Sequence, residues 1–242
     1  MVVNRIKTYV EGLDEKISGG VPEHSVVLIC GRAGTMKTSL CFSILNNNAL
    51  NEQRKCLYLT LEQSRESVME HMENMGIVPC KENVTILDLG KIKKEMLEGE
   101  EGIGYAGQQN WFRIVLSLLA NYKKSFGCEL FALDSLPALY TLTEIRNPRA
   151  ELFYFFEKLR EAKVTTFLIS EMPADREIYG LYGVEDFLCD GIISIFPKRR
   201  ENVTNLYLTV VKMRKTKHDR SMFPLCLLYT SDAADDGESV DL

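Results

Sequence analysis

Apolar runs alternate with amphipathic segments along most of the chain. The runs that predict buried strands cover residues 26–30, 55–61, 84–89, 129–135 and 164–170. The segments with helical spacing cover residues 36–46, 64–75, 111–122 and 147–162. Two last runs, 192–196 and 205–211, flank a polar turn around residues 200–202 and predict an antiparallel ribbon. This order is typical of an α/β fold whose mostly parallel sheet carries helices on both faces.

Two segments interrupt the pattern. The cluster Asn46-Asn47-Asn48 is expected to end or loosen the first long helix, because asparagine side chains compete for backbone hydrogen bonds. Residues 91–104 are charged and contain several glycines, which indicates a surface excursion. The single tryptophan, Trp111, can pack in the core or offer a base-stacking platform, and packing is the favoured interpretation.

The composition fits one soluble α/β domain. The chain has 242 residues, of which 45% are apolar and 26% charged. Its amino terminus lacks the apolar stretch of a secretory signal, and no run of roughly eighteen apolar residues predicts a membrane span. The seven cysteines fall singly and without metal-ligand spacing, which indicates reduced core residues in a cytoplasmic protein.

The segment from Cys226 to Leu242 abandons every earlier pattern. CLLYTSDAADDGESVDL resembles the translation of a sequencing-library adapter. We therefore expect residues 1–225 to form one domain that lacks its natural carboxyl end, and residues 226–242 to be a non-native, disordered tail. From about Ser231 onward the chain is expected to be exposed and without regular structure.

This tail also accounts for the net charge of −5, because it holds five acidic residues and no lysine or arginine. The rest of the chain has 29 basic and 29 acidic residues. The overall balance gives no argument for a nucleic-acid or membrane partner.

A glycine turn follows the run 26–30, and Lys-Thr-Ser opens the next helix. This order is that of a P-loop, in which backbone N–H groups wrap the phosphates of ATP at the positive end of a helix. Lys37 is expected to reach the β- and γ-phosphates, and Thr38 to bring its hydroxyl to Mg²⁺. The alternative is an ordinary glycine-rich turn. The predicted nucleotide-binding positions of the loop are Gly31, Ala33, Gly34, Thr35, Met36, Lys37, Thr38 and Ser39.

Met36 departs from the P-loop pattern, which has glycine immediately before the lysine. A Cβ atom restricts the backbone wherever φ must be positive, and a long side chain lies close to the pyrophosphate. This residue puts nucleotide affinity or turnover in question.

Asp134 stands near the end of the run 129–135, about a hundred residues after the P-loop. A Walker B carboxylate occupies the tip of such a strand and holds Mg²⁺ through water. An aspartate at a strand tip can also cap a helix. Together with the P-loop the metal role is favoured, so Thr38 and Asp134 are the predicted metal residues.

A longer stretch around the P-loop is more specific. GLDEKISGGVPEHSVVLICGRAGTMKTSL, residues 12–40, resembles the opening of RecA-type ATPases of the KaiC family. The methionine immediately before the P-loop lysine resembles the sequence of archaeal KaiC-like proteins at this position. VEDF followed by DGII, within residues 184–193, also resembles the family. The resemblance covers about residues 9–225 and implies a RecA-like P-loop fold.

The resemblance implies a catalytic role for Glu62. It follows the strand after the P-loop helix, where these ATPases carry a carboxylate that polarises the attacking water. KaiC has two adjacent acids there, whereas Gln63 takes the second place in this chain. The alternative is an acid placed near the positive end of the helix 64–75.

The basic run after the last predicted strand also matches the family. Lys212-Met213-Arg214 and His218 have the spacing of residues that reach the nucleotide of the neighbouring subunit in a KaiC ring. The resemblance implies that Lys212 and Arg214 act on the γ-phosphate in trans, with Met213 between them and His218 by the sugar or base. The alternatives are a nucleic-acid patch or a solvated edge.

These observations predict a cytoplasmic, regulatory KaiC-like ATPase that uses ATP and Mg²⁺. By resemblance it forms a homo-oligomeric ring, a hexamer, and acts on a protein partner that the sequence does not identify. One alternative is a nucleotide-binding switch with little hydrolysis. Another is a DNA-dependent recombinase or helicase, but residues 171–183 hold three acids and one arginine where such proteins contact DNA, which speaks against a nucleic-acid partner.

Overall fold

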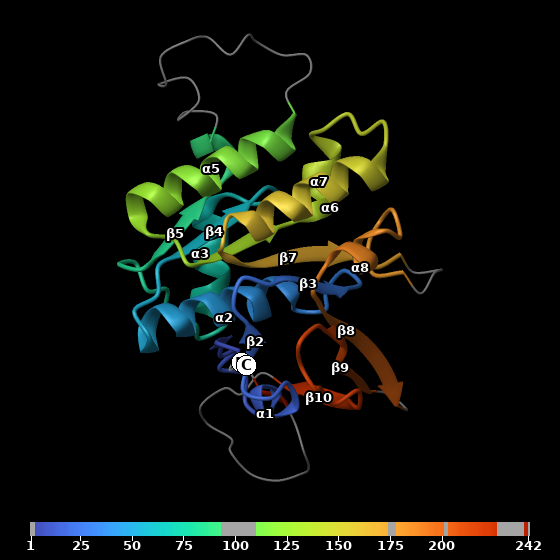
Figure 1. Ribbon diagram of the computed structural model, residues 1–242. Coiled ribbons are helices and arrows are strands. Elements are labelled where there is room, and N and C mark those ends of the chain that lie inside the picture. Colours follow the sequence, from blue (N-terminus) through green and yellow to red (C-terminus); the bar gives the residue numbers. More distant parts are fainter. Residues whose placement is uncertain (1–2, 93–109, 174–177, 201–202, 227–239, 242) are drawn as a thin grey trace, which may run out of the picture.

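Strands and helices alternate from β3 to β8 in the computed structural model, which describes residues 3–92, 110–173, 178–200, 203–226 and 240–241 (Figure 1). The helices are α1 (Leu13–Lys16), α2 (Lys37–Asn51), α3 (Arg65–Asn74), α5 (Trp111–Phe126), α6 (Leu136–Thr141), α7 (Pro148–Glu161) and α8 (Glu185–Leu188). The strands are β1 (Arg5–Ile6), β2 (Val21–Pro22), β3 (Val26–Gly31), β4 (Cys56–Thr60), β5 (Val84–Leu87), β6 (Leu130–Asp134), β7 (Thr165–Glu171), β8 (Gly191–Arg200), β9 (Val203–Met213), β10 (Met222–Cys226) and β11 (Val240–Asp241).

One large sheet organises the molecule, with the strand order β11-β10-β9-β8-β3-β7-β6-β4-β5. The strands from β8 to β5 in this order are parallel to one another. β9 is antiparallel to both β8 and β10, so the carboxyl-terminal part forms a ribbon at one side of the sheet. The predicted α/β fold with a mostly parallel sheet and an antiparallel ribbon is confirmed.

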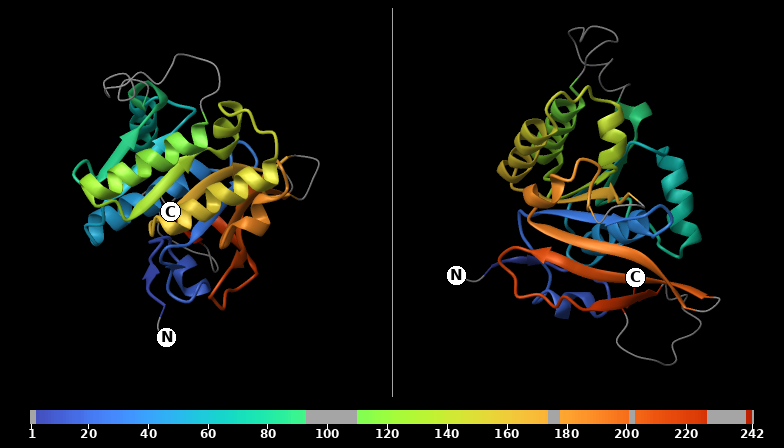
Figure 2. Two further views of the ribbon diagram at one scale, coloured as in Figure 1. Left: turned by 45° about the horizontal axis from the view of Figure 1, so that its top comes forward. Right: turned by 90° about the vertical axis from the view of Figure 1, so that its right-hand side faces the viewer.

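Two apolar cores lie on the two faces of this sheet (Figure 2). Successive residues of a strand point to opposite faces, so Val27 and Ile29 of β3 join the core under α2 and α3, while Leu28 joins the core under α5, α6 and α7. Trp111 packs in the second core with 8% of its surface exposed, which confirms its packing role. The sheet is thus buried on both faces, as a parallel sheet must be.

The first long helix does not end at the asparagine cluster, so the expected end of the helix at this cluster was wrong. α2 continues to Asn51 because the buried asparagines find partners outside the helix. Asn46 donates from Nδ2 to the Val78 carbonyl at 3.0 Å and accepts the Cys80 N–H at 2.7 Å. Asn48 donates to the carbonyl of Lys7 at 2.7 Å. Asn48 also donates to the carbonyl of Ile44 within α2 at 2.8 Å, so its side chain bonds both to the helix backbone and to a neighbouring segment.

Other elements differ from the sequence-based expectation in extent. α6 follows directly after β6 and was not among the predicted helices; Ser135 caps it by accepting the N–H of Ala138. The ribbon strands β8 and β9 run to residues 200 and 203, past the predicted ends. The turn-rich approach to β3 contains α1 and a small antiparallel pair, β1 and β2.

The tail is described only in part. Cys226 belongs to β10, and Val240 and Asp241 pair in parallel with Leu225 and Cys226, so the expected disorder of the tail is wrong for Cys226, Val240 and Asp241. The rest of the predicted disordered tail, 227–239 and 242, lies outside the described residues, as do 93–104 of the predicted surface excursion and 201–202 of the predicted turn. Over the described ranges, no helix combines the length and apolarity needed to cross a membrane.

Candidate nucleotide-binding site

Four strand ends meet at the carboxyl edge of the parallel sheet. β3, β7, β6 and β4 are consecutive neighbours, so the P-loop after β3 lies beside Glu171 at the end of β7 and Asp134 at the end of β6. Glu62 follows β4 by two residues. Open parallel sheets bind ligands at this edge, because the loops there converge on one crevice.

The loop from Gly31 to Met36 has the close contacts of a phosphate cradle. A Cβ atom on Gly31 would lie 2.4 Å from the carbonyl oxygen of Ile195 and 2.5 Å from the Thr35 hydroxyl, so only glycine fits there. Thr35 donates its hydroxyl proton to the Arg32 carbonyl at 2.7 Å, which folds the loop back on itself. Gly34 adopts a φ of 77° and faces open space.

Met36 takes a left-handed conformation at the start of α2, with φ at 61° and ψ at 21°. Glycine adopts this conformation freely, whereas a residue with a Cβ atom pays about 1 kcal/mol or more for it. The departure from the P-loop pattern therefore falls on a position that requires positive φ, as the sequence suggested.

Lys37 is held inside the loop, with 8% of its surface exposed. Its Nζ atom donates to the carbonyl oxygen of Arg32 at 2.9 Å. Burial lowers the pKa of this ammonium group, and the nearby carboxylates of Glu171, Asp134 and Glu62 act in the opposite direction. A single hydrogen bond to a loop carbonyl is one that a phosphate oxygen can replace at little cost.

Thr38 and Asp134 form the centre of the site. Thr38 donates its hydroxyl proton to Oδ2 of Asp134 at 2.9 Å, and the buried Tyr58 donates to the same oxygen at 2.7 Å. Asp134 is only 5% exposed, and burial raises the pKa of its carboxyl group, while the two hydroxyl donors counteract this rise.

This arrangement fits a magnesium ion. Because Thr38 gives its proton to Asp134, the lone pairs of its oxygen remain for a cation. In the part of the chain that the structure describes, no group of three or more His, Cys, Asp or Glu side chains could hold a metal by itself. Mg²⁺ bound with a nucleotide needs only one or two protein groups, since phosphate and water supply its other ligands.

Glu62 lies beside this centre and is exposed to solvent. Its Oε1 atom accepts a hydrogen bond from the hydroxyl of Ser135, the residue that follows Asp134. The cap of α3 is Ser64, which accepts the Ser67 N–H at 3.2 Å, and not Glu62. The carboxylate is therefore anchored toward β6 and not toward the helix that the alternative interpretation invoked.

Ser39 and Ala33 are the remaining residues of the predicted nucleotide-binding loop. Ser39 is buried in the first turn of α2, and its hydroxyl lies 3.1 Å from Nε2 of His71 in α3. Ala33 is exposed at the outer rim of the loop. All predicted loop positions thus lie in one segment around the amino terminus of α2.

Lys212 and Arg214 lie at the opposite edge of the sheet. Lys212 pairs with Ile192 near the start of β8, far from the carboxyl end of β3. Its Nζ atom donates to the carbonyls of Asp186 at 2.7 Å and Cys189 at 2.8 Å, and burial lowers its pKa. Arg214 donates to Oδ1 of Asp190 at 3.0 Å and to the Phe187 carbonyl at 3.2 Å.

Met213 and His218 occupy the same region. The Met213 side chain is 4% exposed and belongs to the core under α2, so it is not open to a ligand. His218 is half-buried, with Nδ1 at 3.4 Å from the Thr216 carbonyl. Its Nε2 atom is buried and has no hydrogen-bond partner among the described residues. The structure therefore does not bring Lys212, Met213, Arg214 and His218 to the P-loop of their own chain.

Comparison with known proteins decides the family. The model of the family described as "ATPase: KaiC" matches residues 6–228. The chain belongs to the KaiC ATPase family. This membership shows a RecA-type P-loop ATPase domain and, at the level of the family, nucleotide binding and ATPase activity.

Relatives of this KaiC-family chain are distant in sequence. It is 26% identical over 229 residues to the circadian clock oscillator protein KaiC of Prochlorococcus marinus subsp. pastoris, covering 94% of this chain and 44% of that protein. It is 23% identical to the circadian clock oscillator protein KaiC 1 of Synechocystis, covering 43% of that protein. The chain thus spans less than half the length of these curated relatives.

A solved structure shows the same fold. The crystal structure of a KaiC-like protein from the archaeon Pyrococcus horikoshii matches with a TM-score of 0.75 and 24% identity, covering 92% of this chain and 94% of that one. The RecA-like architecture of the KaiC-family domain is therefore shown by an experimental structure as well.

Two polar residues of the KaiC-family site were absent from the sequence-based set. Tyr58 and Ser135 both bond to predicted site carboxylates, Tyr58 to Asp134 and Ser135 to Glu62. Ser135 stands directly after Asp134, the predicted Walker B aspartate, which is a usable signal. Tyr58 carries no such signal, because a tyrosine inside an apolar strand is usually core.

Proposed function

We propose that this chain binds MgATP at the carboxyl edge of its sheet and hydrolyses it as a nucleotide-dependent homo-oligomer. The observation that carries the proposal is the bond from Thr38 to Asp134 beside the buried ammonium of Lys37, at four adjacent strand ends. These three side chains supply a positive charge, a hydroxyl oxygen and a carboxylate where a P-loop ATPase needs them.

The P-loop side chains hold the triphosphate. Lys37 exchanges the Arg32 carbonyl for β- and γ-phosphate oxygens, and the first N–H groups of α2 face the phosphates. Thr38 and Asp134 would hold the magnesium ion. Bound Mg²⁺ neutralises charge on the phosphate oxygens.

Glu62 acts on the attacking water. Its carboxylate stands at the site edge, anchored through one oxygen by Ser135 and exposed to solvent. The second oxygen can accept a proton from a water aligned with the γ-phosphate. A single carboxylate in this place is enough for general base catalysis.

Lys212 and Arg214 act on the nucleotide of a second copy. Along the sheet, Lys212 lies level with Leu28, three residues before Gly31, which corresponds to roughly 10 Å at about 3.3 Å per residue. Both cations also point to α8 and Asp190, away from their own P-loop. A head-to-tail arrangement of copies joins this edge to the neighbour's site, and repeated around an axis it closes a ring, a hexamer by family resemblance.

The cellular role that fits this machinery is regulatory. Two relatives are circadian clock oscillator proteins by name. For this chain we propose a cytoplasmic signalling ATPase whose assembly depends on the bound nucleotide and whose output is a contact with a protein partner.

A nucleotide-binding switch with little hydrolysis is the second candidate. The φ of 61° at Met36 favours this candidate, because a strained backbone at this position destabilises the loop that binds the phosphates. Turnover of ATP with Mg²⁺ present separates the two functions: a rate indistinguishable from that of Lys37→Ala identifies a switch.

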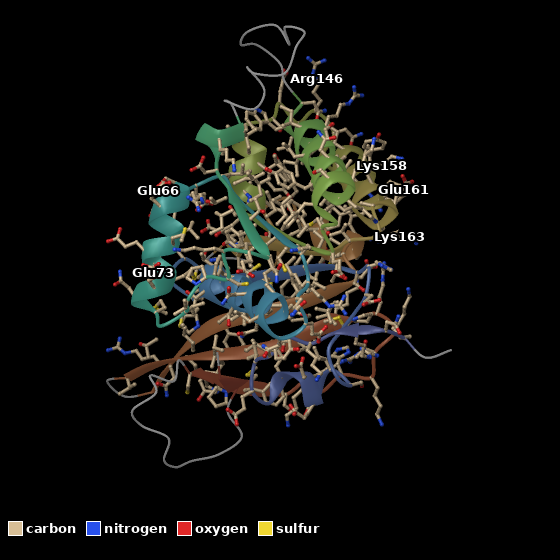
Figure 3. All side chains as sticks on the ribbon, turned by 90° about the vertical axis from the view of Figure 1, so that its left-hand side faces the viewer. Glu66, Glu73, Arg146, Lys158, Glu161 and Lys163 are labelled. Atoms are coloured by element: carbon tan, nitrogen blue, oxygen red, sulfur yellow. The ribbon has the colours of Figure 1, made fainter. Side chains whose placement is uncertain are left out.

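Calorimetric titration with MgATP tests the site itself. Replacing Lys37 by alanine removes the mobile charge on the β- and γ-phosphates, so affinity falls by about 100-fold or more. The matched control is Lys158→Ala, which removes an exposed lysine paired with Glu161 at 2.5 Å on α7 (Figure 3). Equal affinity of the Lys37 variant and the control would remove the P-loop assignment.

A further inference from the structure

Tyr58 brings a hydroxyl group into the middle of the apolar core. It lies in β4, and none of its surface is exposed. Its ring packs edge-on against Phe42 of α2, with the ring centroids 5.3 Å apart. The ring is therefore fixed, and its hydroxyl can point in one direction only.

That direction is the Walker B carboxylate. The Tyr58 hydroxyl donates to Oδ2 of Asp134 at 2.7 Å, and the Thr38 hydroxyl donates to the same oxygen at 2.9 Å. A carboxylate oxygen has about two lone-pair sites, so these two donors fill Oδ2. Neither hydroxyl bonds to Oδ1, which stays available for a hydrated cation.

The two donors differ in what they can do when nucleotide binds. Thr38 has to share its oxygen with the metal ion, and its position follows the start of α2. Tyr58 is held by the core, because its ring is buried and packs against Phe42 of α2. Tyr58 is thus the donor that persists in every state of the site.

We propose that Tyr58 is a positioning residue of the magnesium site: its hydroxyl fixes Oδ2 of Asp134 so that Oδ1 is presented to the hydrated Mg²⁺ of the bound nucleotide. The inference deepens the proposed function and rests on it. Hydrogen bonds that orient metal-binding carboxylates commonly change metal affinity by about 10- to 100-fold when removed.

A buried tyrosine that merely satisfies its hydroxyl would contribute to stability alone. The chain contains such a pair for comparison: Tyr140, 5% exposed, donates to Oε1 of the buried Glu185 at 3.1 Å. This pair has the same chemistry and similar burial, but it lies between α6 and α8, apart from Thr38 and Asp134. Tyr140→Phe is therefore the matched control for Tyr58→Phe.

The experiment measures binding of a non-hydrolysable ATP analogue by fluorescence, in EDTA and over a range of Mg²⁺ concentrations. Mg²⁺ is expected to raise the affinity of the parent for the analogue, and Tyr58→Phe should need about 10-fold more Mg²⁺ to reach half of this increase. In EDTA, Tyr58→Phe should bind the analogue with the same affinity as the parent. Tyr140→Phe is expected to match the parent in both conditions, while denaturant titration shows a loss of stability in both variants.

A double-mutant cycle with Asp134→Asn locates the effect. If Tyr58 acts through Asp134, Tyr58→Phe changes the Mg²⁺ dependence no further in the Asp134→Asn background. Equal Mg²⁺ dependence in Tyr58→Phe and the parent would overturn the inference, as would an equal shift in Tyr140→Phe. A parent whose analogue binding ignores both Mg²⁺ and the Lys37→Ala substitution would overturn the proposed function instead, and the inference with it.

Discussion

The two edges of the parallel sheet hold their polar groups in different ways. At the carboxyl edge, and among the residues that the structure describes, Lys37 has a single hydrogen bond to a loop carbonyl, and Glu62 is bonded through one oxygen. At the amino edge, Lys212 bonds to two carbonyls, and Asp190 accepts Arg214, Arg160 and the Val26 N–H together. The first edge has bonding capacity left for a ligand, and the second is occupied with holding α8 and the strand ends.

This difference teaches how one site can be divided between copies. Side chains that bind a ligand need hydrogen bonds that the ligand can replace. Side chains that contact a neighbouring subunit need hydrogen bonds within their own chain that hold them in place. The Arg214 side chain shows both features, since it is 49% exposed and is anchored on Asp190. In the proposed function, the amino edge supports cations that complete the carboxyl edge of a second copy.

The largest expected effect is a loss of turnover at the carboxyl edge, where Glu62 is proposed to act on the attacking water. Glu62→Gln keeps the bond from Ser135 but cannot take a proton, so kcat falls by about 100-fold or more while MgATP affinity stays the same. The control is Glu66→Gln on the outer face of α3, where Glu66 points away from the sheet (Figure 3). Steady-state hydrolysis and calorimetry check this, and an unchanged kcat would return Glu62 to a purely electrostatic role near α3.

A smaller effect is expected at the amino edge. Asp190→Asn leaves one acceptor oxygen for three donors, so the free energy of unfolding falls by about 1–3 kcal/mol. Denaturant titration measures this loss, and Glu161→Gln, which breaks an exposed ion pair, is expected to cost about 0.5 kcal/mol or less. MgATP affinity of unassembled subunits should not change. A large loss of that affinity would show that the edges are not independent.

The smallest expected effect is a gain in stability and nucleotide affinity at Met36 of the P-loop. Met36→Gly relieves the left-handed backbone at φ 61°, which raises stability by about 1 kcal/mol and improves nucleotide affinity. Lys163→Gly is the matched control, because Lys163 has a φ of 53° just before β7, at the other edge. Thermal melts should rise for both variants, but only Met36→Gly should bind MgATP more tightly. A weaker affinity in Met36→Gly would mean that the methionine side chain itself contributes to binding.

Local patterns predicted what depends on local structure. The P-loop, the strand end at Asp134, the position of Glu62 just after β4 and the helix that begins after Asn147 follow from residues close together in the chain. The role of Tyr58 depends on the register between β4 and β6, which pairs Thr60 with Asp134. A period of two residues cannot fix such a register between strands far apart in sequence.

The wrong and missing elements have similar causes. Asn46 and Asn48 bond to segments before and after α2, and a helix rule that considers neighbours alone counts them as breakers. α6 has six residues, too few for a clear helical period. The carbonyl partners of Lys212 carry no sequence signal, because every residue has a carbonyl.

The central claim, that two edges of different copies form one catalytic site, is tested most directly by mixing two variants. Arg214→Ala retains Glu62, and Glu62→Gln retains Arg214, so each alone should hydrolyse ATP slowly. In a random mixture, about a quarter of the interfaces join an intact Glu62 to an intact Arg214. Turnover of the mixture should rise toward about a quarter of the parent rate. A rate no higher than the mean of the separate variants, in a mixture shown by light scattering to assemble, would contradict the account.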